Sequence, residues 1–138
     1  MRFAILDTNV YIGHWEGRLY GEMLETVRRS YIVRQSAVVL SELRRGARTR
    51  DAEQVVTNLF RLAPVRWEPT AGDWWEAGGL IRKIGDREGW DRNKRRDFQN
   101  DALIALTARR HGATVVTADA SDFELLAQEL HITILPVT

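Results

Sequence analysis

Two short apolar runs that lead into aspartates constrain the fold of this sequence more than any other feature. Phe3–Leu6 runs directly into Asp7, and the segment ATVVTAD at 113–119 ends in Asp119. Continuous apolar runs of this length are typical of strands that are buried on both faces of a parallel sheet. Because ligands bind beyond the carboxyl ends of such strands, we expect both aspartates at one functional edge of the sheet.

Segments with helical spacing alternate with these and other short β-rich runs. Further strands are expected at 31–35, 65–67 and 132–137, and residues 89–97 are expected to form a polar loop. Helices are predicted at 17–29, from a Ser36 cap to about Ala47, at 51–63, 70–89 and 98–111, and from a Ser121–Glu124 capping box to about Leu130. The alternation predicts an α/β sandwich around a parallel sheet.

Length and composition predict one compact cytoplasmic domain that spans residues 1–138. The chain has 138 residues, of which 44% are hydrophobic and 28% charged, and its net charge is +1. No apolar stretch approaches the roughly 20 residues of a membrane helix, and the first apolar run is too short for a signal peptide. The absence of cysteine excludes disulfides, thiolate nucleophiles and sulfur-ligated zinc. His14, His111 and His131 lie in unrelated contexts, which argues against a histidine-rich metal site.

Two further acids lie in helices that are otherwise apolar. Glu42 has apolar neighbours on both sides, and Asp101 stands at the start of NDALIALTA (100–108), a helix that is expected to be largely buried. A carboxylate near a core costs several kcal/mol unless it is paired or bound to a cation. If Asp7 and Asp119 converge with these two acids, a divalent ion would relieve their repulsion. A site whose ligands are all oxygen atoms selects the hard ions Mg²⁺ or Mn²⁺.

Each acid taken singly also has a local explanation. These explanations are a helix cap at Thr8 for Asp7, a turn or cap for Asp119, the dipole of the first helical turn for Asp101, and an ion pair with Arg45 or Arg48 for Glu42. The set of four acids at these structural positions and in this order is the more specific signal.

The motifs around the four acids resemble the PIN-domain family, most closely the VapC-type toxins of type II bacterial toxin–antitoxin pairs. The matching segments cover essentially the whole chain: LDTNV (6–10), SELRRG (41–46), NDALIALTA (100–108) and VVTADASDF (115–123). Asp7, Glu42, Asp101 and Asp119 fall on the family's acidic positions. Many of these toxins carry asparagine where this chain has Asp119, so the acidic set is complete here.

The resemblance implies a PIN-like three-layer α/β/α sandwich with a central, mainly parallel sheet of four to five strands. It also implies endonucleolytic cleavage of RNA that depends on Mg²⁺, with Mn²⁺ as a substitute. Asp7 and Asp101 are expected to hold the main ion, because they lie on the most rigid elements. Glu42 and Asp119 would complete the catalytic site, and Asp122 would assist in metal binding. Asn9 and Thr117 match the polar residues that support the first and last carboxylates.

The basic residues are almost all arginines. Two clusters of them, at 43–50 and 91–97, flank proposed metal ligands. Arginine's planar fork suits phosphate, so the clusters are predicted to contact RNA without reading its sequence. The predicted contacts are Arg44, Arg45, Arg48, Arg92, Lys94, Arg95 and Arg96. An arginine-rich solvated surface is the alternative interpretation of either cluster alone.

The resemblance further implies a homodimer and a groove for a cognate antitoxin protein. Five tryptophans are relevant to such contacts. Trp74 falls on the apolar face of its helix and is predicted to be core. Trp15, Trp67, Trp75 and Trp90 are candidates for contacts with RNA or protein.

Three other functions compete with the toxin hypothesis. The first is a PIN-domain nuclease of RNA processing that is not a toxin, and the second is a catalytically silent module that binds protein or RNA. The third, a receiver or phosphatase domain, also places acids at strand ends. The phosphatase type it brings to mind needs an aspartate two residues after the first, where this chain has Asn9.

Overall fold

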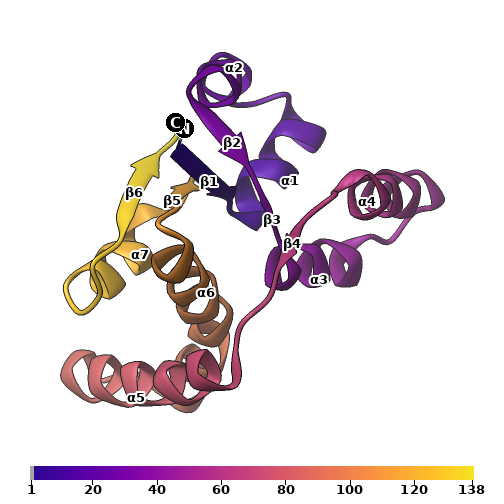
Figure 1. Cartoon of the computed structure of the whole chain (residues 1–138). Coiled ribbons are helices and arrows are strands. Elements are labelled where there is room, and N and C mark those ends of the chain that lie inside the picture. Colours follow the sequence, from indigo (N-terminus) through magenta and orange to yellow (C-terminus); the bar gives the residue numbers. More distant parts are fainter. Residues whose placement is uncertain (1) are drawn as a thin grey trace.

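The centre of the computed structural model, which describes residues 2–138, is a four-stranded parallel sheet (Figure 1). Its strands are β1 (Arg2–Leu6), β2 (Tyr31–Val33), β5 (Thr114–Thr117) and β6 (Thr133–Pro136), in the order β2-β1-β5-β6. All neighbouring strands run parallel. A separate pair consists of β3 (Gln35–Ser36) and β4 (Arg66–Trp67). The predicted α/β fold with four to five mainly parallel strands is confirmed.

Helices cover both faces of the sheet (Figure 1). They are α1 (Thr8–Gly17), α2 (Gly21–Ser30), α3 (Ala37–Gly46), α4 (Arg50–Leu62), α5 (Ala71–Glu88), α6 (Arg92–His111) and α7 (Ala120–Ala127). Helix α6 contacts β1 and β5, and it is flanked by α5 and α7. Helix α3 contacts both α1 and α6. Helix α4 packs on α3 and extends away from the sheet in Figure 1. None of the described helices is long and apolar enough to cross a membrane.

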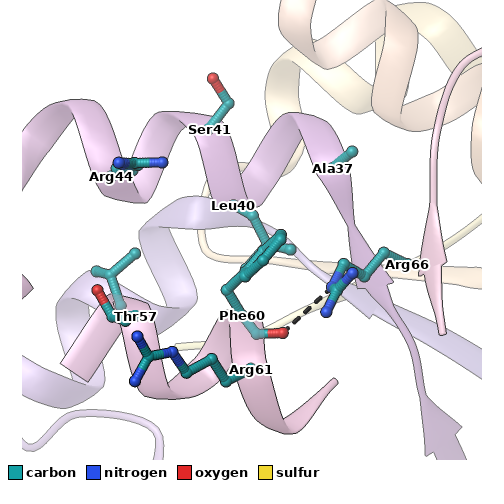
Figure 2. A pocket seen from close by; sticks show the side chains of 9 residues that line it. Ala37, Leu40, Ser41, Arg44, Thr57, Phe60, Arg61 and Arg66 are labelled. Atoms are coloured by element: carbon teal, nitrogen blue, oxygen red, sulfur yellow. Dashed lines mark hydrogen bonds between the residues drawn. The ribbon is translucent and has the colours of Figure 1, made fainter. Parts of the chain in front are cut away.

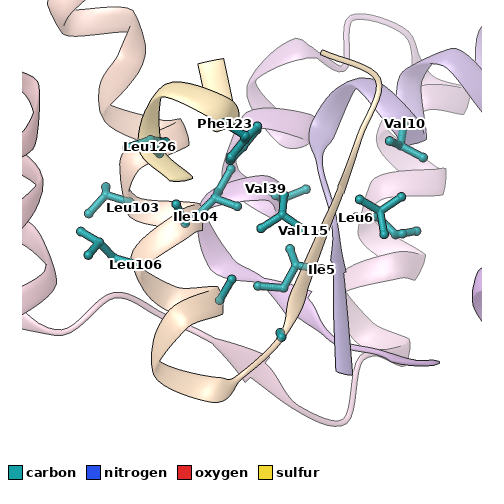
Figure 3. Close-up of a cluster of buried hydrophobic side chains, with 14 of the residues drawn as sticks. Ile5, Leu6, Val10, Val39, Leu103, Ile104, Leu106, Val115, Phe123 and Leu126 are labelled. Atoms are coloured by element: carbon teal, nitrogen blue, oxygen red, sulfur yellow. The ribbon is translucent and has the colours of Figure 1, made fainter. Parts of the chain in front are cut away.

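The hydrophobic core fixes helix α6 against the sheet. Residues 102–108 of α6 are fully buried, and Figure 3 shows Ile104 of this helix beside Val115 and Phe123. Ile5 of β1 lies in the same cluster. Burial of one large aliphatic side chain contributes about 1.5–3 kcal/mol, so the leucine and isoleucine side chains of this stretch hold the helix rigidly. Any side chain that α6 presents toward the sheet edge is therefore firmly placed.

The prediction of a loop at 89–97 is wrong, because α6 begins at Arg92. Asp91 caps the helix by accepting a hydrogen bond from the backbone N–H of Lys94 at 2.8 Å. The polar residues that suggested a loop form the mostly exposed first turns of the helix. Asp101 consequently lies in the middle of α6, where it cannot act as a first-turn partner of the helix dipole.

The predicted helix at 17–29 is also wrong at its start. Helix α1 ends at Gly17, and α2 begins only at Gly21. Arg18 and Tyr20 have the positive φ angles of 54° and 65° that turn the chain between the two helices. The Tyr20 ring packs so close to Gly13 that a Cβ there would meet it at 2.6 Å, which accounts for the glycine.

The last predicted capping box does not form. Helix α7 begins at Ala120, one residue before Ser121, and Asp119 takes the cap position without a capping hydrogen bond. The Ser121 hydroxyl donates to Asp119 Oδ1 at 2.8 Å instead. The serine thus fixes the last carboxylate of the predicted site.

The tryptophans divide differently from the prediction. Trp74 is 51% exposed and is not a core residue, because α5 turns this face toward solvent, and Trp75 is 87% exposed. Trp67 is buried and stacks on His111, with ring centroids 3.9 Å apart. Trp90 packs edge-on against Phe98 of α6 at 4.7 Å. Among these four, only the pair on α5 remains available for contacts with a partner.

Candidate active site

Asp7 follows β1 and is almost completely buried, with 5% of its surface exposed. Its backbone N–H donates to the carbonyl of Val116 at 2.8 Å, which continues the pairing of β1 with β5. One side-chain oxygen accepts the Thr8 N–H at 2.8 Å, and the other accepts the Thr117 hydroxyl at 2.9 Å. The expected cap of α1 is therefore present, and it leaves the carboxylate fixed at the sheet edge.

Burial raises the pKa of Asp7 from 3.8 to about 6. The hydrogen bonds from Thr117 and Thr8 lower this pKa, and the negative charges of Glu42 and Asp119 raise it further. A hydrogen-bonded cap in water has no such shift. Asp7 is thus a buried carboxyl group within reach of two other negative charges.

Asp101 shows the same effect more strongly from the middle of α6. Burial raises its pKa to about 8, followed by the charge of Asp7. The charges of Asp122, Glu42 and Asp119 add to the rise, in that order. The fold therefore brings Asp7, Glu42, Asp119 and Asp122 within electrostatic reach of Asp101.

Glu42 reaches this cluster from α3 and is held by a residue that the sequence did not single out. The Thr8 hydroxyl donates to Glu42 Oε1 at 2.8 Å. Among residues 2–138, Glu42 forms no ion pair, so the predicted pairing with Arg45 or Arg48 is absent. The available signal for Thr8 was its place between Asp7 and Asn9 at the start of α1.

Asn9 and Thr117 connect α1 to the end of β5. Asn9 Oδ1 accepts the Ala118 N–H at 3.1 Å, and Asn9 Nδ2 lies 3.5 Å from the Thr117 hydroxyl. The same hydroxyl accepts the Asp119 N–H at 3.1 Å while donating to Asp7. Thr117 is fully buried. These contacts fix the Asp7 carboxylate relative to the backbone at the end of β5, next to Asp119.

The donor set of this edge fits a hard divalent cation. All of its acids offer carboxylate oxygens, and two of them are buried enough to resist ionising together. Among residues 2–138, no three Asp, Glu, His or Cys side chains lie close enough together to form a metal-binding group as they stand. Ligation would thus require side-chain movements, for which Glu42 and Asp119 have room because Glu42 is only partly buried and Asp119 is exposed.

The side chains of the second basic cluster, at the start of α6, have different partners. Arg95 donates to the Trp90 carbonyl at 3.0 Å and to Asp86 at 2.9 Å, and it packs on Gly85 of α5. Lys94 pairs with Asp122 at 2.9 Å. Both side chains are thus partly buried and engaged by other groups of the chain. Of the other residues predicted to contact RNA, Arg48 and Arg92 are exposed.

A polar cleft of about 430 Å³ opens beside Glu42. Its lining combines α3 and α6: Glu42, Arg45, Arg96, Asp97, Gln99 and Asn100. One arginine from each predicted basic cluster therefore reaches the same cleft. Arg44 instead lines a groove between α3 and α4. The cleft therefore places positive charge next to Glu42.

The chain matches the family model described as "PIN domain" over residues 4–129. No curated protein matches it significantly. Among solved structures, it is similar to VapBC2 from Rickettsia felis bound to a promoter DNA fragment, with 20% identity, 99% of each chain covered and a TM-score of 0.69. It is also similar to VapBC-1 from nontypeable Haemophilus influenzae, with 18% identity, 97% of each chain covered and a TM-score of 0.69.

A third similar structure is VapBC-5 of the VapBC toxin–antitoxin family from Mycobacterium tuberculosis. The identity is 24%, the shares covered are 99% of this chain and 100% of the other, and the TM-score is 0.61. At these identities the structural similarity speaks for the fold alone. The family match, which covers most of the chain and includes all four acids, shows that this protein belongs to the PIN-domain family.

Proposed function

We propose that this chain is a single PIN domain that acts as a metal-dependent endoribonuclease and as the toxin of a VapBC-type pair in the cytoplasm. One observation carries the nuclease proposal. Asp7 is buried at the end of β1, and Asp101 is partly buried on α6, close enough that the charge of Asp7 raises the pKa of Asp101. Such an arrangement is costly without a cation and useful with one.

In this proposal Asp7 and Asp101 hold Mg²⁺, or Mn²⁺ in its place, and Glu42 and Asp119 complete the site directly or through water. The bound ion would acidify a water molecule and stabilise the charge on the phosphate. Thr117 and Thr8 orient Asp7 and Glu42 through their hydroxyls. Since water attacks rather than a ribose 2′-hydroxyl, the products carry a 5′-phosphate and a 3′-hydroxyl.

RNA is proposed to enter along the cleft that Arg45 and Arg96 line. Both arginines are exposed and lie near Glu42, so they can neutralise phosphates beside the acidic edge. Arg95 and Lys94 are instead paired with Asp86 and Asp122 of the chain itself. Of the second cluster, the exposed residues Arg92 and Arg96 therefore remain as predicted RNA contacts.

The toxin proposal is supported by a groove between α3 and α4 that suits an antitoxin segment. The groove measures about 470 Å³, and Figure 2 shows Phe60 of α4 pointing toward Leu40 of α3. Its lining is Ala37, Leu40, Ser41, Arg44, Val56, Thr57, Phe60, Arg61 and Arg66. This lining has arginines and no acid, so it favours a partner segment with apolar and acidic side chains. The similar structures include VapB–VapC complexes, and a homodimer is proposed on the same family grounds.

The proposal is tested by incubating the purified protein with total RNA and Mn²⁺, Mg²⁺ or EDTA, and by mapping the new 5′ ends. We expect cleavage with either ion, none with EDTA, and none for Asp7→Asn. Cleavage that persists in EDTA or in Asp7→Asn would overturn the metal-nuclease proposal. Absence of any cleavage would favour the silent binding module.

Toxin and processing nuclease are separated in the cell. A toxin stops growth when it is induced, and co-expression of a small protein encoded beside it restores growth. A processing nuclease needs no such partner. Growth that continues normally under induction of an active nuclease would remove the toxin assignment and leave the chemistry in place.

A further inference from the structure

Lys94 is the one basic side chain, among the residues that the structure describes, that forms an ion pair with an acid of the predicted site. Its ammonium lies 2.9 Å from Asp122 Oδ2 and 3.1 Å from Oδ1, so it engages both oxygens of that carboxylate. It also lies 5.0 Å from the ring centroid of Trp90 and 5.8 Å from that of Phe98. Two aromatic faces and a carboxylate therefore hold this cation in place.

Lys94 stands on the same stripe of α6 as Asp101. Lys94, Phe98 and Asp101 are spaced i, i+4 and i+7, and a rise of about 1.5 Å per residue places the ends about 10 Å apart. Asp122 lies close enough to Asp101 to raise the pKa of Asp101. The ammonium thus pairs with an acid whose charge acts on Asp101.

We propose that the Lys94 ammonium is a built-in counterion that occupies Asp122 in place of a second divalent cation, so that the chain binds a single ion when RNA is absent. The inference rests on the proposed function, since it takes Asp7 and Asp101 as the ligands of that ion. A second cation at Asp122 would have to displace the ammonium from both oxygens and from two aromatic contacts. Lys94 is accordingly a positioning residue of the site and does not contact the RNA.

The test counts ions on RNA-free protein with Mn²⁺ alone as the probe. Electron paramagnetic resonance and calorimetric titrations would compare the wild type with Lys94→Gln. We expect one Mn²⁺ on the wild type and two on Lys94→Gln, with the first bound about tenfold more tightly because a nearby positive charge is gone. Circular dichroism confirms that the variant is folded.

The matched control is Lys83→Gln, the only other lysine change that the chain offers. Lys83 pairs with Glu129 at 2.7 Å, on the surface between α5 and the segment after α7, and its loss should leave Mn²⁺ binding as in the wild type. In the double variant Lys94→Gln/Asp122→Asn the count should return to one. If Lys94→Gln does not fold, Asp122→Asn alone should bind one ion about tenfold more weakly, because the ammonium then lacks its partner.

Two results overturn the inference while leaving the proposed nuclease intact. They are two ions on the wild type, and equal stoichiometry and affinity for the wild type and Lys94→Gln. For Asp122→Asn alone, unchanged affinity has the same meaning. If the wild type binds no Mn²⁺ at all, the metal-dependent function fails and the inference fails with it.

Discussion

Thr8 shows how one residue can align two acids of the site. Its backbone N–H binds Asp7 and its hydroxyl binds Glu42, so a single residue at the start of α1 contacts carboxylates from two different elements. Thr8→Val keeps the shape and the N–H but loses the hydroxyl bond. A hydrogen bond to a charged group contributes about 1.5–3 kcal/mol, so we expect RNA cleavage to fall about tenfold or more at limiting Mn²⁺.

Thr26→Val is the matched control for this substitution. The Thr26 hydroxyl bonds only to the Glu22 carbonyl on the exposed surface of α2, and its loss should leave cleavage unchanged. Initial rates on a labelled RNA at several Mn²⁺ concentrations provide the measurement. Equal rates for Thr8→Val and the wild type would mean that Glu42 is positioned without Thr8.

At the scale of elements, neighbouring arginines in the first turns of α6 have different surroundings. Arg96 faces the cleft beside Glu42, whereas Arg95 ties α6 to α5 through Asp86 and the Trp90 carbonyl. Arg96→Gln should weaken RNA binding severalfold and reduce the slope of log affinity against log salt by about one contact. Its melting temperature should stay close to that of the wild type.

Arg95→Gln should have the opposite profile. Loss of its bonds to Asp86 and the Trp90 carbonyl should destabilise the protein by about 1 kcal/mol and leave the salt slope unchanged. Thermal melting and fluorescence anisotropy on the same RNA separate the two effects. A reduced salt slope for Arg95→Gln would return this residue to the RNA-binding surface.

Helix α4 carries the partner prediction, because one of its exposed apolar side chains, Phe60, lines the groove. Phe60 is 47% exposed, and the Arg66 guanidinium lies 3.8 Å from its ring centroid. Phe60→Asp places a negative charge where the proposed antitoxin segment brings its own acids. We expect antitoxin binding to weaken at least about tenfold while RNA cleavage by the free protein is retained. Binding that is unaffected would place the antitoxin elsewhere.

The strands and the order of the acids were predictable, because buried parallel strands and residues at their ends have a clear local signature. The start of α6 was not, since a polar segment that is exposed on a helix resembles a loop in composition. The environment of Lys94 was equally hidden. Its contact with Asp122 joins residues 28 positions apart, and only the packing of α7 beside α6 creates it. Trp74 was misplaced because helical spacing predicts an apolar stripe but not whether another element covers it.

At the scale of the whole molecule, the acidic edge makes the stability of the metal-free protein depend on pH. In the folded chain the pKa of Asp101 is about 8, against an ordinary value of 3.8 in the unfolded chain. Between these values the folded state binds more protons than the unfolded state, so the free energy of unfolding falls as pH rises. The stabilisation is complete below pH about 4 and is lost as pH passes through about 8.

The window from pH 7 to 8.5 isolates Asp101 from the other shifted groups. The pKa of Asp7 lies lower, at about 6, and the pKa of His111 is lowered by burial from 6.5, so both have largely titrated below this window. Asp73 and Glu129 have lowered pKa values and act only in acid. Denaturant melts in EDTA should therefore show a loss on the order of 1 kcal/mol across the window for the wild type.

Asp101→Asn is the decisive comparison for this pH dependence, because it keeps the shape of the side chain without its charge. Its stability in EDTA should be nearly constant from pH 7 to 8.5 and should exceed that of the wild type at the upper end. Saturating Mg²⁺ should restore the wild type most at pH 8.5, where binding no longer has to displace the proton, and should restore Asp101→Asn little. A wild type as insensitive to pH as Asp101→Asn would mean that Asp101 is ionised in the metal-free fold. The cost of ionising Asp101 at the acidic edge would then be met without a bound cation.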